Sequence, residues 1–259
     1  TNGIKGDVIE LHIDYKKQVW IVTDNNWTSK KKVVYQYLQK FDEHTKFEIL
    51  DSIRRGNREF TRLTSDRDNN LCWSSLTKGT LLYNENGKPL HSKYNMPISE
   101  NATEIDNRGT SFFDKKNRHY YFPTNKGITC YNPIKKIWEP ILNKAISIYH
   151  AIEDAEGNIW FAGDSYLFKI DHLGNFTDFT ETIQKHLAFT NISQLFVDNN
   201  SLLWIATDNG LIKLEIKTKV FKQLFRSNEK DWGNSMRSIF ETKDSTIVAM
   251  YERDKQLVT

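Results

Sequence analysis

The residue types that most often carry chemistry are few in this sequence of 259 residues, which contains seven histidines and two cysteines. No two histidines have a spacing that predicts a shared metal ion, and none is placed beside an evident nucleophile. The cysteines, Cys72 and Cys130, are too few for a disulfide framework and form no metal-ligand pair. We expect both to be buried free thiols. The sequence therefore predicts no metal site, no cofactor and no catalytic residue.

Aromatic and polar residues in expected loops point to a ligand-binding site more clearly than any residues point to a metal or catalytic site. Trp27 lies in the segment NNWTSKKK and Trp232 in EKDWGNS, each between stretches that read as strands. An exposed ring can cover the apolar face of a sugar, and the guanidinium of Arg237 offers several donors in fixed geometry. Tyr166 follows an expected strand close to the same kind of loop. These four residues form the predicted ligand-binding set, and the alternative is that each ring packs under its own loop.

Charge and hydropathy exclude other classes of protein. Lys and Arg number 36 against 33 Asp and Glu, a net charge of +3 that is too small and too scattered for a nucleic-acid track. Apolar runs are much shorter than the roughly 20 residues that span a bilayer, and no charged and then apolar leader opens the chain. We therefore expect a globular segment that binds no nucleic acid.

An internal repeat organises the elements that must hold these residues. Residues 146–179 and 192–225 each begin with an apolar run that ends in Asp, continue through a polar turn, and reach Trp six residues after the Asp. The same step occurs in four places: Asp14 to Trp20, Asp114 to Tyr120, Asp154 to Trp160 and Asp198 to Trp204. We interpret the Trp as core and the Asp as an acceptor for turn amides.

Two weaker copies complete the series. One joins Asp66 to Trp73 with one residue more, and the other, residues 236–250, has Thr242 and Val248 in the Asp and Trp places. The anchors near 20, 73, 120, 160, 204 and 248 then recur at about the 40 to 50 residues of a four-stranded propeller blade.

The fold predicted from this pattern is all-β: a β-propeller of four-stranded antiparallel blades, in one domain over residues 1–259. About five and a half blades are covered, the sixth stopping after its second strand, as part of a larger seven-bladed propeller. The second strands are continuously apolar, which indicates burial on both faces. One short helix is expected at 181–188, and a β-sandwich is the alternative fold.

Counting back four residues from each Asp place gives a set of polar residues on the expected first strands. Because first strands line the axis of a propeller, we expect these side chains to face the central channel, either as a wet lining or as ligand contacts. They are Glu10, Thr110, His150, Gln194 and Ser238.

The stretches FVDNNSLLWIATDNGLIKL (196–214) and AIEDAEGNIWFAGDSYLFKI (151–170) resemble the two-component regulator propeller repeat. The resemblance implies the sensor region of a hybrid histidine kinase of the Bacteroidetes type, in which two propellers and a small β-sandwich lie in the periplasm and respond to glycan fragments. It implies an oligosaccharide ligand, a neighbouring propeller or β-sandwich domain of the same chain, and a kinase elsewhere in the protein. A homodimer stays open.

Three functions follow as hypotheses of different classes. The first is a periplasmic ligand-sensing propeller that signals to a membrane histidine kinase. The second is a protein-interaction propeller without a small-molecule ligand. The third is a propeller lyase, for which His12 and His150 are the histidines expected on inner strands.

Overall fold

The computed structural model describes residues 4–24, 35–41, 47–54, 61–75, 79–90, 110–122, 127–185, 189, 191–218, 220–224, 235–251 and 257–258. It divides into two compact units, Thr1–Ala145 and Ile146–Thr259. Each unit is described by itself, so the expectation of a single domain stays a prediction.

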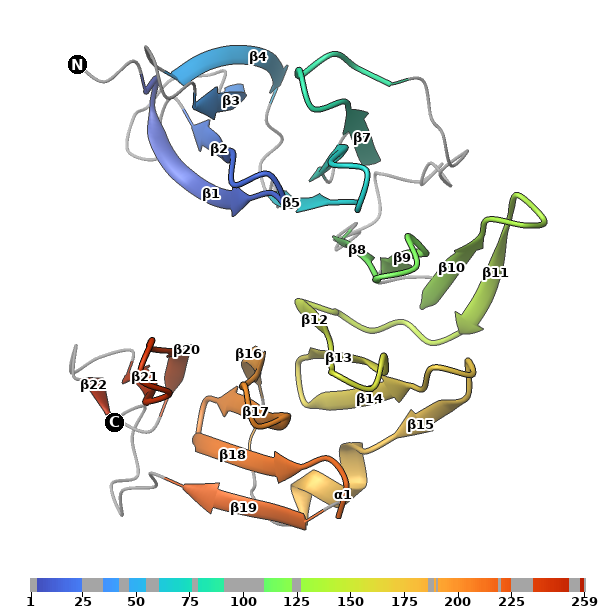
Figure 1. Cartoon of the computed structure of the whole chain (residues 1–259), viewed down its shortest axis with the longest axis vertical. Helices are drawn as coiled ribbons and strands as arrows, with labels where there is room; N and C mark the ends of the chain where they lie inside the picture. The colour runs from blue at the N-terminus through green and yellow to red at the C-terminus, as the bar shows by residue number, and fades with distance from the viewer. Residues whose placement is uncertain are drawn as a thin grey trace. The chain divides into compact units, whose positions relative to one another are not determined.

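The first unit contains three antiparallel sheets whose strands follow chain order (Figure 1). The first sheet is β1 (Asp7–Ile13), β2 (Val19–Asp24), β3 (Tyr35–Phe41) and β4 (Phe47–Arg54). The second sheet is β5 (Thr61–Ser65), β6 (Leu71–Ser75) and β7 (Gly79–Tyr83). The third sheet is β8 (Thr110–Phe113), β9 (His119–Phe122), β10 (Ile128–Asn132) and β11 (Ile137–Leu142).

The second unit repeats this plan, with a single turn of helix, α1 (Thr180–Gln184), after its first sheet. The fourth sheet is β12 (His150–Glu153), β13 (Ile159–Gly163), β14 (Tyr166–Ile170) and β15 (Phe176–Asp178). The fifth is β16 (Ile192–Val197), β17 (Leu202–Thr207), β18 (Gly210–Glu215) and β19 (Val220–Leu224). The sixth is β20 (Met236–Glu241), β21 (Ile247–Tyr251) and β22 (Leu257–Val258), so it has a third strand where the sequence predicted only two.

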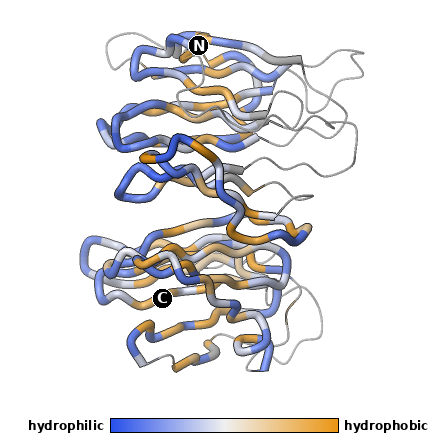
Figure 2. Tube along the Cα trace, turned by 90° about the vertical axis from the view of Figure 1, so that its right-hand side faces the viewer, coloured by the Kyte–Doolittle hydropathy of each residue, from blue (hydrophilic) through white to orange (hydrophobic). Residues whose placement is uncertain are grey.

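The predicted repeat is confirmed strand by strand. Each of the six anchors lies in the second strand of its own sheet, and Trp160 and Trp204 belong to different sheets. The continuous apolar runs are buried: all five residues of β13 are buried, as are all but the first of β17. In Figure 2 hydrophobic stretches recur along the strands, and hydrophilic residues are common at the turns.

The second sheet departs from the prediction by one residue. Its turn is no longer than the others, because Asp66 N bonds Asn70 O as Asp14 N bonds Gln18 O. The residue six places after Asp66 is therefore Cys72. Cys72 pairs with Thr64, two residues before Asp66, just as Trp20 in the first sheet pairs with His12, two residues before Asp14. Since neighbouring strand residues point to opposite faces, Trp73 lies on the other face from Trp20 and its equivalents.

Consecutive sheets stack by one rule. Each sheet has two faces. The anchor face is the one that carries the residue six places after the Asp position, such as Trp20 in the first sheet, and the rear face is the opposite one. The anchor face of the first sheet, with Trp20 and Val22, packs on Leu63 and Trp73 of the second sheet's rear face. In the same way, the anchor face of the second sheet packs on the rear face of the third, that of the fourth on the fifth, and that of the fifth on the sixth.

The first strands of stacked sheets are neighbours. β1 contacts β5 and β5 contacts β8, and in the second unit β12 contacts β16 and β16 contacts β20 (Figure 1). The first strands thus line one edge of each unit.

The repeated aspartates are turn structure, as predicted. Oδ1 of Asp154 accepts the amides of Glu156 and Asn158 at 3.0 and 2.9 Å, and its Oδ2 accepts the indole Nε1–H of Trp160 at 2.8 Å. Asp14 and Asp198 hold Trp20 and Trp204 in the same way. These carboxylates are buried, so they stabilise the repeat and are poorly placed to meet a substrate.

Candidate functional site

The candidate ligand site is built from the turns at one end of the sheets, where second strands pass to third strands and the chain enters each first strand. We call this end of a unit its loop face. In the fourth sheet the turn from β13 to β14 runs from Gly163 to Tyr166, and Asp164 in it has a positive φ of 46°. Close packing explains the glycine, since a Cβ at Gly163 would lie 1.7 Å from the carbonyl oxygen of Ser147.

Hydrogen bonds fix this turn to its surroundings. The Tyr149 hydroxyl donates to Asp164 Oδ1 at 3.0 Å, and the main-chain oxygen of Asp164 accepts the amide of Ile192, at the start of the next sheet, at 2.8 Å. The half-buried Tyr166 ring stacks on Phe168 with centroids 5.7 Å apart. The Tyr149 hydroxyl and the Asp164 carboxylate therefore meet at this turn, and Tyr166 begins the strand that follows it.

The fifth sheet has an equivalent turn. Thr207 Oγ1 donates to Gly210 O at 2.8 Å and accepts the amide of Asn209 at 3.1 Å, while Asp208 N bonds Asn191 O at 3.0 Å. Gly210 has a φ of 112°, a backbone conformation that favours glycine in a tight Asn–Gly turn. The loop face of the second unit thus offers polar side chains on short, well-tied turns.

The structure places only part of the predicted ligand-binding set. Tyr166 lies on the loop face as expected. Trp27 and Trp232 lie outside the described residues, as does the side chain of Arg237, whose backbone belongs to β20. Position 237 falls at a register shift between β20 and β21, and β1 and β16 have shifts at the same place. A bulge of this kind redirects side chains near functional sites.

The predicted inner set occupies one register position. Glu10, Thr110, His150, Gln194 and Ser238 pair with the residue two places after the anchor position in the second strand of their sheets. Arg62 pairs with Ser74 at this position in the second sheet and completes the set. Arg62 is also four residues before Asp66, so the same counting rule applied to the second repeat would have identified it from the sequence. The side chain of Thr110 lies outside the described part.

Two members of this set contact the next sheet. Arg62 Nη1 donates to Glu10 Oε2 at 2.8 Å, and burial raises the pKa of the Glu10 carboxyl despite the opposing effect of Arg62. Gln194 Oε1 accepts the amide of Ile239 at 2.8 Å and its Nε2 donates to Ile239 O at 3.3 Å. These side chains join neighbouring first strands. Their position relative to a central channel stays a prediction.

Burial disfavours the charged forms of two cysteines and two histidines. Cys72 is buried as expected and Cys130 is half-buried; burial raises the pKa of the first thiol to about 12 and of the second to about 11. Burial lowers the pKa of His12 and, to about 3, that of His119. Within these residues, no three His, Cys, Asp or Glu side chains are grouped to hold a metal ion.

Comparison with protein-family models and with curated protein sequences gives no match. Solved structures do match. The extracellular domain of the putative hybrid two component system BT4673 from B. thetaiotaomicron superposes with a TM-score of 0.64 at 15% identity, over 97% of this chain and 37% of that one. That of BT3049 from the same organism gives 0.61 at 16% identity, over 99% and 40%.

The fold is that of a β-propeller. Its sheets are the blades, and the anchor faces are the surfaces by which one blade packs on the next. PorZ, an essential bacterial surface component of the type-IX secretion system of Porphyromonas gingivalis, shares this fold with a TM-score of 0.60 at 12% identity, over 99% of this chain. The propeller described here spans 37 to 42% of the length of these three structures. None of the helices among the described residues has the length and apolar character needed to cross a membrane.

Proposed function

We propose that this chain is part of the extracytoplasmic, periplasmic sensor region of a two-component regulatory system, and that it binds a glycan fragment. The observation that carries the proposal is the fold: propeller blades that follow the extracellular domains of two putative hybrid two component systems over 97 and 99% of this chain.

The loop face of the second unit supports a glycan as the ligand. The Tyr149 hydroxyl donates to Asp164 on a turn held by main-chain hydrogen bonds, and Tyr166 follows Asp164 by two residues. Aromatic rings cover the apolar faces of sugar rings, and a carboxylate accepts hydrogen bonds from their hydroxyls. Trp27, Trp232 and Arg237 are the sequence-predicted additions to this site.

Signalling requires a difference in affinity. A glycan changes the equilibrium between two arrangements of the sensor only by the ratio of its affinities for them. The second arrangement involves a neighbouring propeller or β-sandwich domain of the same protein, and the kinase lies elsewhere in that protein. In this proposal the 259-residue segment binds and relays, catalyses no reaction and needs no cofactor.

A protein-interaction propeller is the second candidate. The match to PorZ favours it, since that structure is described as a surface component of a secretion system. In this alternative the loop face contacts a protein, and free glycan fragments do not bind.

We expect Tyr166→Ala to weaken binding of a glycan fragment by about tenfold or more, equivalent to about 1.4 kcal/mol. The ring lies on the loop face and its loss leaves the turn bonds of Asp164 in place. Isothermal titration calorimetry on the variant and the parent chain measures the change. Trp232→Ala is expected to act in the same direction while barely changing the melting temperature.

Tyr15→Ala is the matched control. Tyr15 is 46% exposed and follows Asp14 in the turn from β1 to β2, at the other end of its blade. It should leave glycan affinity unchanged. If both tyrosine variants bind as the parent does, while Tyr166→Ala lowers the melting temperature, Tyr166 is a packing residue and the loop face of the second unit is the wrong site.

A further inference from the structure

Basic side chains gather on the turns that join the first and second strands of the three sheets in the first unit. These turns are residues 14–18, 66–70 and 114–118, and we call them together the turn row. All three have one conformation, because the amide of each leading Asp bonds the carbonyl four residues later, as Asp66 N bonds Asn70 O at 2.9 Å. They lie at the end of the unit opposite its loop face. Their exposed charged residues are five basic and one acidic: Lys16, Lys17, Arg67, Lys115, Lys116 and Asp68.

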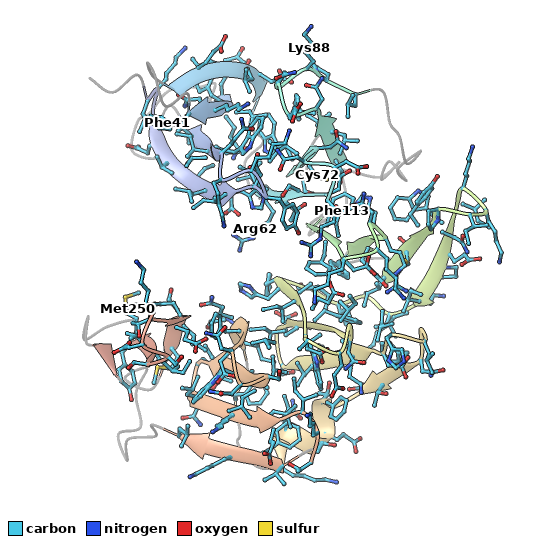
Figure 3. The ribbon with its side chains drawn as sticks, in the orientation of Figure 1. Phe41, Arg62, Cys72, Lys88, Phe113 and Met250 are labelled. Atoms are coloured by element: carbon cyan, nitrogen blue, oxygen red, sulfur yellow. The ribbon has the colours of Figure 1, made fainter. Side chains whose placement is uncertain are left out.

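Hydrogen bonds join the three turns into one surface. Asn69 Nδ2 of the second turn donates to Asp14 Oδ2 of the first at 3.1 Å. The amide of Arg67 in the second turn donates to Asn117 Oδ1 of the third at 2.7 Å. In Figure 3 Phe113, the residue before the third turn, lies where the third sheet meets the second. The turn row is therefore continuous across three sheets.

The repeat itself does not require these charges. In the second unit the equivalent turns are residues 154–158, 198–202 and 242–246, which make the same main-chain hydrogen bonds. Their exposed charged residues are one basic and two acidic: Lys243, Glu156 and Asp244. The basic residues read as scattered in the sequence, whereas the folded first unit brings two lysine doublets, 16–17 and 115–116, onto one row of turns.

Lys17 adopts a backbone conformation that is unfavourable for lysine. Its φ is 64°, in the left-handed region where a Cβ is crowded and where Gly and Asn are the usual residues. The third residue after the Asp position has a positive φ in all six sheets, and the other five are Asn, Gly or Ser: Asn69, Asn117, Gly157, Ser201 and Ser245. Lysine is therefore the costly choice at this position, and such a cost points to a function for the side chain.

The shape and composition of the turn row favour a broad anionic surface as its partner. Three equal turns project from the ends of the sheets, whereas small ligands are held in concave pockets. Lys16 and Lys17 carry compact charges on flexible stems, which suit phosphate groups at variable positions. Tyr15, beside them, is 46% exposed, and tyrosine is enriched where proteins meet the membrane–water interface.

We propose that the turn row docks the first unit on a membrane surface rich in anionic phospholipids. The lysine ammonium groups contact lipid phosphates, and the Tyr15 ring lies at the level of the headgroups. A membrane as the partner rests on the proposed sensor that signals to a membrane kinase, but not on glycan binding at the loop face. Lys16 also forms an ion pair with Glu85 from outside the row, so the test uses Lys17 and Lys116.

Co-sedimentation with lipid vesicles tests this docking surface. The 259-residue chain is mixed with vesicles of phosphatidylcholine and phosphatidylglycerol in equal parts, and with vesicles of phosphatidylcholine alone. We expect binding to the anionic vesicles only, weakened by added salt. In the double variant Lys17→Asn, Lys116→Gln the affinity should fall by at least tenfold, because each basic residue near an anionic surface contributes about fivefold, or about 1 kcal/mol.

The matched control is the double variant Lys185→Gln, Lys222→Gln. Both lysines are exposed and lie outside the turn row, and their replacement changes the net charge by the same amount. This variant should bind anionic vesicles as the parent chain does. Equal weakening in the two double variants would show that net charge alone attracts the chain to the vesicles, and would overturn the proposal.

Lys17→Asn alone separates docking from folding. It should weaken vesicle binding about fivefold, while the melting temperature stays the same or rises because Asn tolerates a positive φ. Equal binding to both kinds of vesicle, or no binding to either at low salt, would overturn the proposal. Binding of soluble polygalacturonate that is lost in Lys17→Asn, Lys116→Gln, without binding to vesicles, would assign the row to an acidic glycan and also overturn it. Titration with glycan fragments at the loop face is independent of each of these results.

Discussion

Replacing Asp154 with alanine is expected to lower the free energy of unfolding by about 3 to 5 kcal/mol, because four donors lose one buried acceptor. Its carboxylate accepts the amides of Glu156 and Asn158, the Asn158 side-chain amide and the Trp160 indole, at 2.8 to 3.0 Å. Asp154 is 1% exposed, so water cannot readily replace the lost acceptor. Urea unfolding at neutral pH measures the change.

Asp171→Ala is the matched control for this effect. Asp171 makes the same turn, accepting the amides of Leu173 and Asn175 and the Asn175 side chain, but it holds no indole and the turn is exposed. We expect a much smaller loss there, because water can replace the lost acceptor at an exposed turn. Equal losses in the two variants would show that the indole bond and burial add nothing, and that the repeated Asp acts only through its turn.

Acid should destabilise the protein through His119. The ring stacks on Phe113 at a centroid distance of 4.3 Å and meets the edge of Trp138 at 4.9 Å, and burial lowers its pKa from 6.5 to about 3. Below pH 6.5 the unfolded chain binds a proton at this residue and the folded chain does not. The free energy of unfolding should therefore fall by about 1.4 kcal/mol per pH unit from this residue, from 6.5 down to about 3.

His119→Phe keeps a ring at this position and removes the titration. Urea unfolding at several pH values between 7 and 4 should give a shallower dependence on pH than the parent chain shows. Phe113→Leu, which changes the same stack without removing a titrating group, should lower stability at every pH and keep the parent slope. An unchanged slope in His119→Phe would mean that His119 takes up its proton in the folded protein as it does in the unfolded one.

The sequence predicted the repeat well because its features are local. An Asp that accepts turn amides and an indole six residues later leaves a fixed spacing, and Trp204 lies in a second strand, β17, as that spacing predicted. The register of the second blade was not found. In that blade Cys72 occupies the anchor position, whereas the sequence-based prediction placed the anchor at the next residue, Trp73.

The candidate site was harder to predict for a physical reason. Tyr149 and Asp164 are brought together by pairing of β12 with β13, and nothing in their spacing of fifteen residues indicates that contact. The link from Glu10 to Arg62 joins two blades across fifty-two residues. Interactions between blades depend on stacking that the repeat implies only in general terms, whereas Arg62 itself could be found by counting from Asp66.

Calorimetric titration of the 259-residue chain with size-fractionated glycan fragments, beside the corresponding monosaccharides, tests the central claim most directly. A ligand-sensing propeller should bind one class of fragment saturably at a single site per chain, and Tyr166→Ala should weaken that binding. Absence of saturable binding for every fragment class, from a chain that unfolds cooperatively in the same buffer, would contradict the glycan-sensing account and favour a propeller that contacts proteins.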